Sequence, residues 1–222
     1  VKSTRDIRVD HIVLLDNDQQ KLKTYGEISR ELSRRLDPDL TFEVTSDARA
    51  ALTGVDYIIT TIRAGGDAGR LFDEQTCLAH GVLGQETTGA GGFAMAIRSV
   101  PTLVYYCTLA REVANPGHLI FNFTNPSGII TQALRSKGFD NVYGICDAPS
   151  GFIKQLEEIP EIPYGTLDIE CYGLNHLSWF RNAKVNGRDV QRELLDNPRT
   201  YEHSEMRLFT REMARISGDC ML

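Results

Sequence analysis

Cys146 and His176 are the two residues of this sequence whose types point most directly to chemistry. Thiolate and imidazole groups are the side chains that best hold a borderline-soft divalent metal ion. The two residues stand 30 positions apart, and each follows a predicted β-strand. Two protein ligands leave other coordination positions open to a substrate, as in a catalytic rather than a closed structural site. The pair therefore predicts a catalytic metal site, with the neighbouring Asp147 carboxyl group as a candidate acid.

The segments that would position these residues alternate between short apolar strands and helices. This alternation is typical of a parallel, doubly wound sheet, so we predict an α/β fold of the Rossmann-like kind. Residues 11–15 and 55–60 are expected to be buried strands, and Pro101 is expected to kink or break a long helix at 93–114. Further strands are predicted at 41–45, 118–123 and 141–145, and further helices at 19–36, after residues 46–47 and up to residue 137.

After residue 166 the pattern changes. Residues 167–172 and 179–185 look like antiparallel strands, and Asn186-Gly187 is a strong hairpin turn signal. We therefore expect a Rossmann-like domain of the dinucleotide-fold kind over residues 1–160 and the start of an α+β domain over residues 161–222. Asp16 closes what resembles the second strand of a dinucleotide fold, so its first strand and glycine-rich loop are expected to precede Val1.

Composition limits the classes of partner. The 222 residues are 41% hydrophobic with a net charge of −6, and the sequence has no cluster of Lys and Arg. We therefore expect neither a nucleic-acid nor a membrane partner, and we find no apolar run of the length that spans a bilayer. The five cysteines are scattered and form no Cys-x-x-Cys motif, which favours free thiols in a reducing cytoplasm.

Three other residues follow predicted strands or loops and have two interpretations each. Asp16 is placed to bind the ribose hydroxyls of NAD, or else belongs to a helix cap. Arg70 is suited to a phosphate or carboxylate, or else forms a surface ion pair with Asp73 or Glu74. Asn125 is placed to hold a sugar hydroxyl, or else makes a local turn. The glycine-rich run at 84–92 is a weak signal for anion binding, with a packed loop as the alternative.

Taken together, the motifs resemble the NAD- and manganese-dependent glycosidases of glycoside hydrolase family 4, the 6-phospho-α- and 6-phospho-β-glucosidases. The matching motifs run in order across most of the chain. They are Arg63-Ala64-Gly65-Gly66, Asp73-Glu74-Gln75, Gly84-Gln85-Glu86-Thr87-Thr88-Gly89, Asn122-Phe123-Thr124-Asn125-Pro126, Cys146-Asp147-Ala148-Pro149 and Tyr172-Gly173-Leu174-Asn175-His176.

The resemblance implies a role for each matching residue. Cys146 and His176 would hold Mn²⁺ or another divalent metal, and Asp147 would be the proton donor and a substrate contact. The substrate would also meet Arg70 and Asn125, and NAD would lie along Asp16, Thr61, Ile62 and Arg63. The implied reaction is hydrolysis of a phosphorylated sugar through NAD-dependent oxidation at carbon 3, metal-assisted deprotonation at carbon 2, elimination and addition of water. Family members form homodimers or homotetramers.

The anomer stays open. The sequence Cys146-Asp147 resembles the α-specific branch, whereas the sequence motifs around Asn125 and His176 resemble the β-specific branch. Two other functions remain as alternatives: an NAD-dependent 2-hydroxy acid dehydrogenase, and an inactive, truncated module that binds a sugar phosphate or nucleotide. The dehydrogenase shares the fold but gives no reason for a Cys–His pair.

Overall fold

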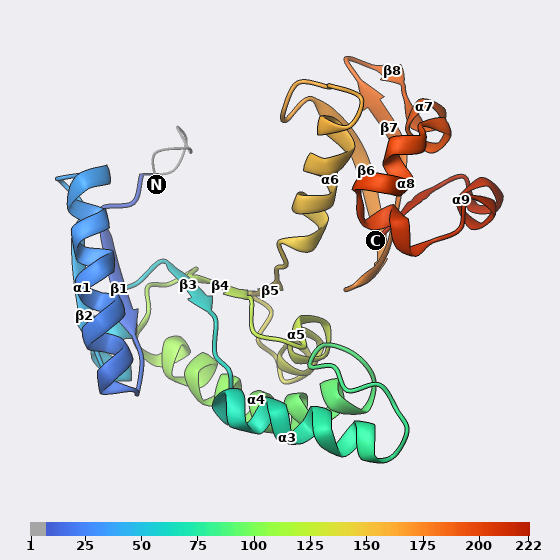
Figure 1. Cartoon of the computed structure of the whole chain (residues 1–222). Helices are drawn as coiled ribbons and strands as arrows, with labels where there is room; N and C mark the ends of the chain where they lie inside the picture. Colours follow the sequence, from blue (N-terminus) through green and yellow to red (C-terminus); the bar gives the residue numbers. More distant parts are fainter. Residues whose placement is uncertain (1–7) are drawn as a thin grey trace.

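The computed structural model describes residues 8–222, in which parallel strands and helices alternate before an antiparallel sheet closes the chain (Figure 1). In the first part the elements are β1 (His11–Leu15), α1 (Gln19–Leu36), β2 (Thr41–Thr45), α2 (Ala48–Leu52), β3 (Tyr57–Thr60), α3 (Gly66–Ala79), α4 (Gly89–Val113), β4 (Leu119–Asn122), α5 (Ser127–Ser136) and β5 (Val142–Gly144). They continue with α6 (Ala148–Glu158), β6 (Leu167–Leu174), β7 (Leu177–Val185), β8 (Arg188–Asp189), α7 (Gln191–Asp196), α8 (Pro198–His203), the 3₁₀ helix η1 (Glu205–Leu208), α9 (Arg211–Ser217) and β9 (Cys220–Met221).

The parallel strands form two separate ladders. β1 pairs with β2, and β4 lies between β3 and β5, with all pairs parallel. Figure 1 shows the β1–β2 pair beside α1, apart from the β3–β4–β5 sheet. In each ladder the strands share one carboxyl end, which is where ligands bind in open α/β sheets. The predicted α/β class is thus confirmed.

The expectation that β1 and β3 are buried is wrong. Every described position of β1 is only half-buried or exposed, and Tyr57 and Ile59 of β3 are exposed. The other face of the three-stranded sheet is covered, because Ile120 and Val142 belong to a core with residues of α4 and α5. The sheet is therefore covered by helices on one face only within residues 8–222.

Helix α4 is the central helix of the first part, and Pro101 lies inside it without ending it. Of the expected kink or break at Pro101, the break is therefore absent. By length and hydropathy alone α4 would suffice to cross a membrane, contrary to our expectation for this sequence. Here it packs against α2, α3 and α5 and buries Leu103, Cys107 and Ala110, which is the behaviour of a core helix.

The last part of the chain forms the predicted antiparallel sheet. β6 pairs with β7, and β7 pairs with both β8 and β9. Asn186 and Gly187 have φ values of 51° and 80°, as a tight hairpin turn between β7 and β8 requires. A second core cluster contains Phe180 and Met206, and α6 joins it through Phe152 and Leu156. The division at residue 160 stays a prediction.

Candidate active site

Cys146 and His176 lie together in the structure. The Cys146 Sγ atom is 3.7 Å from the His176 Nε2 atom. Typical ligand distances of about 2.3 Å for sulfur and about 2.0 Å for nitrogen, at a tetrahedral angle, place two such atoms about 3.5 Å apart. The pair therefore has the spacing of two ligands of one ion. Within residues 8–222, no group of three or more His, Cys, Asp or Glu side chains has the geometry to hold a metal.

Cys146 is positioned by the end of β5 and the start of α6. The Ile145 N–H donates to the Asn122 carbonyl oxygen at 2.9 Å, which extends the parallel ladder to the residue before the cysteine. Helix α6 then begins at Ala148, with Pro149 in its first turn, where a proline needs no hydrogen-bond partner. The cysteine therefore occupies a short connection held at both ends.

His176 is positioned by a different element, the two-residue turn between β6 and β7. Leu174 pairs with Leu177, so Asn175 and His176 form the turn, and His176 has a φ of 60°. Below the turn, Gly173 has a φ of 116°, and a Cβ there would meet the Leu177 carbonyl oxygen at 2.6 Å. The conformation of the hairpin tip thus depends on a glycine three residues before the histidine.

Asp147 is an exposed residue beside this pair. Its Oδ1 atom lies 3.9 Å from the Cys146 Sγ atom, at the limit for a hydrogen bond to sulfur. Asp147 is the residue before α6, but its side chain makes no capping hydrogen bond. The carboxyl group is therefore free to face a substrate next to the thiol.

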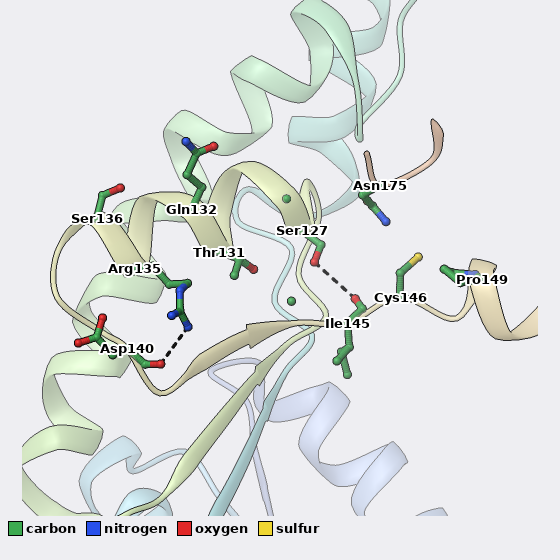
Figure 2. Close-up of a pocket in the computed structure, with 12 residues that line it drawn as sticks. Ser127, Thr131, Gln132, Arg135, Ser136, Asp140, Ile145, Cys146, Pro149 and Asn175 are labelled. Carbon is green, nitrogen blue, oxygen red and sulfur yellow. Dashed lines mark hydrogen bonds between the residues drawn. The ribbon is translucent and has the colours of Figure 1, made fainter. Parts of the chain in front are cut away.

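A cleft of about 780 Å³ opens along α5 and reaches Cys146. Figure 2 shows Cys146 and Asn175 at one end of the cleft and Arg135 and Asp140 at the other. The Asn175 Oδ1 atom is buried without a hydrogen-bond partner among the described residues. Of the other predicted site residues, none lines this cleft, so it covers only the metal-pair side of the candidate site.

Most of the remaining predicted residues follow the carboxyl ends of other parallel strands. Asp16 follows β1, and its Oδ1 atom accepts from the Asp18 N–H at 2.9 Å, while Asp18 caps α1. The helix cap is therefore Asp18 rather than Asp16. Burial chiefly raises the pKa of Tyr106 on α4, and the charges of Tyr105 and Asp16 add to this.

The segment Thr61, Ile62 and Arg63 follows β3, and the half-buried Asn125 follows β4. The Ile62 N–H donates to the Thr124 Oγ1 atom at 3.0 Å, which ties the two connections together. No residue from 8 to 222 forms a hydrogen bond with the Asn125 side chain. Its amide is thus available to a ligand.

Arg70, on α3, forms the ion pair that was the alternative to a ligand contact. Its Nε atom donates to Glu74 Oε1 at 2.8 Å, and Nη1 lies 3.8 Å from Glu86 Oε1. The hydrogen bond to Glu74, helped by the charge of Glu86, raises the pKa of Arg70. Arg63 also faces Glu86, at 3.3 Å. The largely buried Glu86 therefore lies between two arginines that sequence interpretation had placed near NAD and substrate.

The sequence analysis did not predict helix α3 or the ion pair that holds it against α4. Asp73 is buried and pairs with Arg98 of α4, not with Arg70. The Arg98 Nε atom also donates to the Ala64 carbonyl oxygen at 3.3 Å. This pair raises the pKa of Arg98 and holds the loop after β3 against α4. A helical period after Gly66 was the signal that would have revealed α3.

The glycine-rich run at 84–92 is a packed loop. The Thr87 and Thr88 N–H groups both donate to the Gln85 Oε1 atom. A Cβ at Gly84 would meet the Glu74 carbonyl oxygen at 2.5 Å, so this glycine allows close approach to α3. Two of the N–H groups that an anion would use are occupied, which favours the alternative interpretation of this loop.

The fold and the thiol–imidazole pair define an α/β protein of the dinucleotide-binding type with a metal-compatible pair at the carboxyl edge of its sheet. Residues 1–162 match the family described as Family 4 glycosyl hydrolase. The chain therefore belongs to glycosyl hydrolase family 4.

Relatives with described activities include both anomeric specificities. The chain is 35% identical over 196 residues to the 6-phospho-beta-glucosidase BglT of Thermotoga maritima, covering 87% of this chain and 46% of that protein. It is 34% identical over 196 residues to the phospho-alpha-glucosidase PagL of Clostridium acetobutylicum, covering 84% and 44%. The chain thus spans less than half the length of these relatives.

The solved structures that are similar to this chain also include both 6-phospho-α- and 6-phospho-β-glucosidases. The 6-phospho-beta glucosidase of Thermotoga maritima with NAD and glucose-6-phosphate superposes with a TM-score of 0.84 at 29% identity, over 97% of this chain and 51% of that one. A 6-phospho-alpha-glucosidase from gut microorganisms, in complex with NAD and Mn²⁺, gives 0.83 at 28% identity, over 96% and 52%. Malate dehydrogenase of Salinibacter ruber gives 0.60 at 16% identity, over 87% and 56%, which shows a shared fold only.

Proposed function

We propose that the complete protein hydrolyses 6-phosphoglucosides with NAD and a divalent metal ion as cofactors. The observation that carries this proposal is the 3.7 Å approach of Cys146 and His176 in a chain of family 4. Two structural relatives are complexes with NAD and glucose-6-phosphate or with NAD and Mn²⁺, which supports these cofactors and this class of substrate. A 2-hydroxy acid dehydrogenase would leave the thiol–imidazole pair without a task.

When bound, NAD supplies a reversible hydride acceptor and the metal supplies a Lewis acid. Cys146 and His176 would hold the metal at the end of the cleft. Asp147 would hold the proton that the leaving group requires. This carboxyl group lies beside the metal ligand, so acid and metal would act on neighbouring atoms of one sugar.

Other residues would bind rather than react. The Asn125 amide has the donors and acceptor that a sugar hydroxyl requires. Arg70 would contact the substrate through its guanidinium group. This group would then have to give up part of its contacts with Glu74 and Glu86 in favour of the substrate. Asp16 and the segment from Thr61 to Arg63 would lie along NAD, since they follow β1 and β3 at the carboxyl end.

The choice of metal ion depends on all the ligands around it, not only on Cys146 and His176. A thiol and an imidazole by themselves favour softer ions than Mn²⁺, which prefers oxygen ligands. With only two such ligands, substrate and water oxygens would complete the sphere and make it suitable for Mn²⁺. We propose Mn²⁺ because a structural relative contains it.

We further propose a cytoplasmic homodimer or homotetramer with no nucleic-acid or membrane partner. A phosphorylated sugar is charged and does not cross a bilayer unaided, which supports an enzyme inside the cell. The relatives that match include both α- and β-glucosidases at similar identity, so both substrate anomers belong in the assay.

The test uses the complete protein with chromogenic 6-phospho-α- and 6-phospho-β-glucosides. Cleavage is expected only when NAD⁺ and Mn²⁺ are both present, and a chelator should abolish it. Cleavage that persists without NAD⁺ or in the presence of the chelator would disprove the proposal. Accumulation of NADH with malate or lactate would instead support a dehydrogenase.

A further inference from the structure

Asn122 is a buried polar residue that the proposed function does not use. It is the last residue of β4, the central strand of the three-stranded sheet, and it is 0% exposed. Burying an amide costs free energy unless its donors and acceptor are paired. The partners of Asn122 therefore show what this residue holds in place.

The side chain of Asn122 connects three elements. Its Oδ1 atom accepts from Thr60 Oγ1 at 3.0 Å and from the Thr124 N–H at 3.3 Å. Its Nδ2 atom donates to Thr131 Oγ1 at 3.2 Å and lies 3.4 Å from the carbonyl oxygens of Thr124 and Ser127. Carbonyl oxygens only accept and a backbone N–H only donates, so the orientation of the amide is fixed.

The backbone of Asn122 connects to the metal-pair side. Its carbonyl oxygen accepts from the Ile145 N–H at 2.9 Å and from Ser127 Oγ at 3.2 Å. Ser127 Oγ also lies 3.4 Å from the Ile145 carbonyl oxygen, the contact drawn beside Cys146 in Figure 2. One residue thus fixes the turn that carries Asn125 and the strand exit that carries Cys146.

We propose that Asn122 is a positioning residue that holds Asn125 and Cys146 at the separation one sugar requires. The inference rests on the proposed function, since it gives those two residues a common ligand. Asn122 itself touches neither the substrate nor the metal. Supporting hydrogen bonds of this kind orient metal ligands and hold functional groups to within about 0.5 Å, so their loss weakens binding without removing a ligand.

The decisive variant is Asn122→Asp in the complete protein. The carboxyl group keeps the size and the acceptor for Thr60. When ionised it has no donor for Thr131, Thr124 or Ser127, and when protonated it has one O–H in place of the two N–H donors of the amide. The matched control is Asn141→Asp at the amino end of the same sheet, where Nδ2 donates to the His118 carbonyl oxygen at 3.0 Å. Both variants replace an amide that donates to neighbouring groups, through three contacts at Asn122 and one at Asn141, but only Asn122 adjoins the site.

The effect of each substitution is measured as the affinity for two ligands, and neither measurement requires enzyme activity. Mn²⁺ alone is titrated by electron paramagnetic resonance, and glucose 6-phosphate is titrated into the Mn²⁺-loaded protein by calorimetry. Asn122→Asp is expected to weaken both by about ten-fold or more. Asn141→Asp is expected to change neither by more than about two-fold, even where the two variants lower the thermal midpoint equally.

The outcomes separate the inference from the proposed function. A native protein that binds neither probe contradicts the proposed function and, with it, the role of Asn122. A native protein that binds both, beside an Asn122→Asp variant of equal affinity, contradicts the positioning role alone. Equal losses in Asn122→Asp and Asn141→Asp would also overturn it, because the effect would then be general.

A milder variant covers the case in which Asn122→Asp does not fold. Ser127→Ala keeps Asn122 but removes the hydroxyl contact with the Ile145 carbonyl oxygen. Weaker Mn²⁺ binding than in the native protein supports the proposal. Unchanged affinity for both probes overturns it. Ser136→Ala, at the other end of α5, serves as the control, and no change is expected there.

Discussion

The two members of the Cys146–His176 pair are held by regions of different construction. Cys146 follows the parallel strand β5, and the residue between them, Ile145, is hydrogen-bonded to Asn122 of β4 and contacts Ser127 of α5. His176 stands at the tip of an antiparallel hairpin, with the exposed Leu174 and Leu177 beside it. One ligand therefore depends on long-range hydrogen bonds, and the other depends on the local conformation of a turn.

This difference indicates which of the two regions better tolerates an amino-acid substitution. In a buried network, a partner that shifts slightly retains its other contacts, whereas replacement of the central amide leaves buried groups unpaired. A two-residue turn has no such reserve, since its shape is set by a few dihedral angles. The hairpin does have support lower down, where Tyr172 stacks on Trp179 with ring centres 6.2 Å apart and donates to Asp219 at 2.7 Å.

The largest expected effect comes from removing the ligands themselves. Cys146→Ala and His176→Ala should each lower Mn²⁺-dependent hydrolysis by about 100-fold or more, because a Lewis acid contributes several kcal/mol to such a reaction. The double variant should lose little beyond either single variant, since residues that act as a unit are not additive. Multiplying losses in kcat/KM would show that the two side chains do not hold one ion.

A smaller effect is expected at the glycines before the two ligands. In Gly173→Ala the new methyl group would meet the Leu177 backbone and the Trp179 ring, and the φ of 116° is strained for any residue with a Cβ. In Gly144→Ala it would meet the Thr131 and Ser127 hydroxyls at 2.7 and 3.0 Å. Rotation of those side chains relieves the clash at the cost of their contacts with Asn122, while the Asn122 contacts with Thr60 and Thr124 remain.

Gly173→Ala should therefore weaken Mn²⁺ binding by about ten-fold, and Gly144→Ala by less. Titration of Mn²⁺ by electron paramagnetic resonance measures both affinities, with thermal unfolding as the control for global damage. The reverse order would mean that the network, rather than the hairpin, is the more sensitive support.

The sequence identified the pair because chemistry and strand exits are both visible along the chain. Strands 11–15 and 41–45 and helix 19–36 agree with the structure to the residue, since their apolar patterns are regular. The carboxyl-end placement of Asn125 and Cys146 followed from parallel strands in general.

The sequence could not show what covers each apolar helix face, nor which residue pairs with each buried polar side chain. Apolar residues recur with a helical period along α1, yet their side chains are exposed within the described residues: Tyr25, Ile28, Leu32 and Leu36. Periodicity defines a face but not what covers it. Asp73 pairs with Arg98, which lies 25 positions further along the chain. Asn122 contacts Thr60, which is 62 positions away, and its other contacts depend on the direction of its side chain. No local pattern encodes them.

The smallest expected effect concerns the two buried thiols, one in each core cluster. Burial raises the pKa of Cys107 to about 11 and that of Cys220 to about 12, from an ordinary value of 9.0. Above pH 9 the unfolded chain loses these protons while the folded protein keeps them, so the free energy of unfolding falls as pH rises. At pH 10 each thiol should lower it by about 1 kcal/mol.

Urea unfolding of the native protein, Cys107→Ala and Cys220→Ala at pH 8 and pH 10 measures this effect. Each variant should lose about 1 kcal/mol less than the native protein between the two pH values, because its thiol no longer contributes. One transition that responds to both substitutions would show that the two regions unfold together. Two transitions, each altered by only one substitution, would separate the regions as the division at residue 160 predicts. An unchanged pH dependence in both variants would contradict the inferred burial of the thiols.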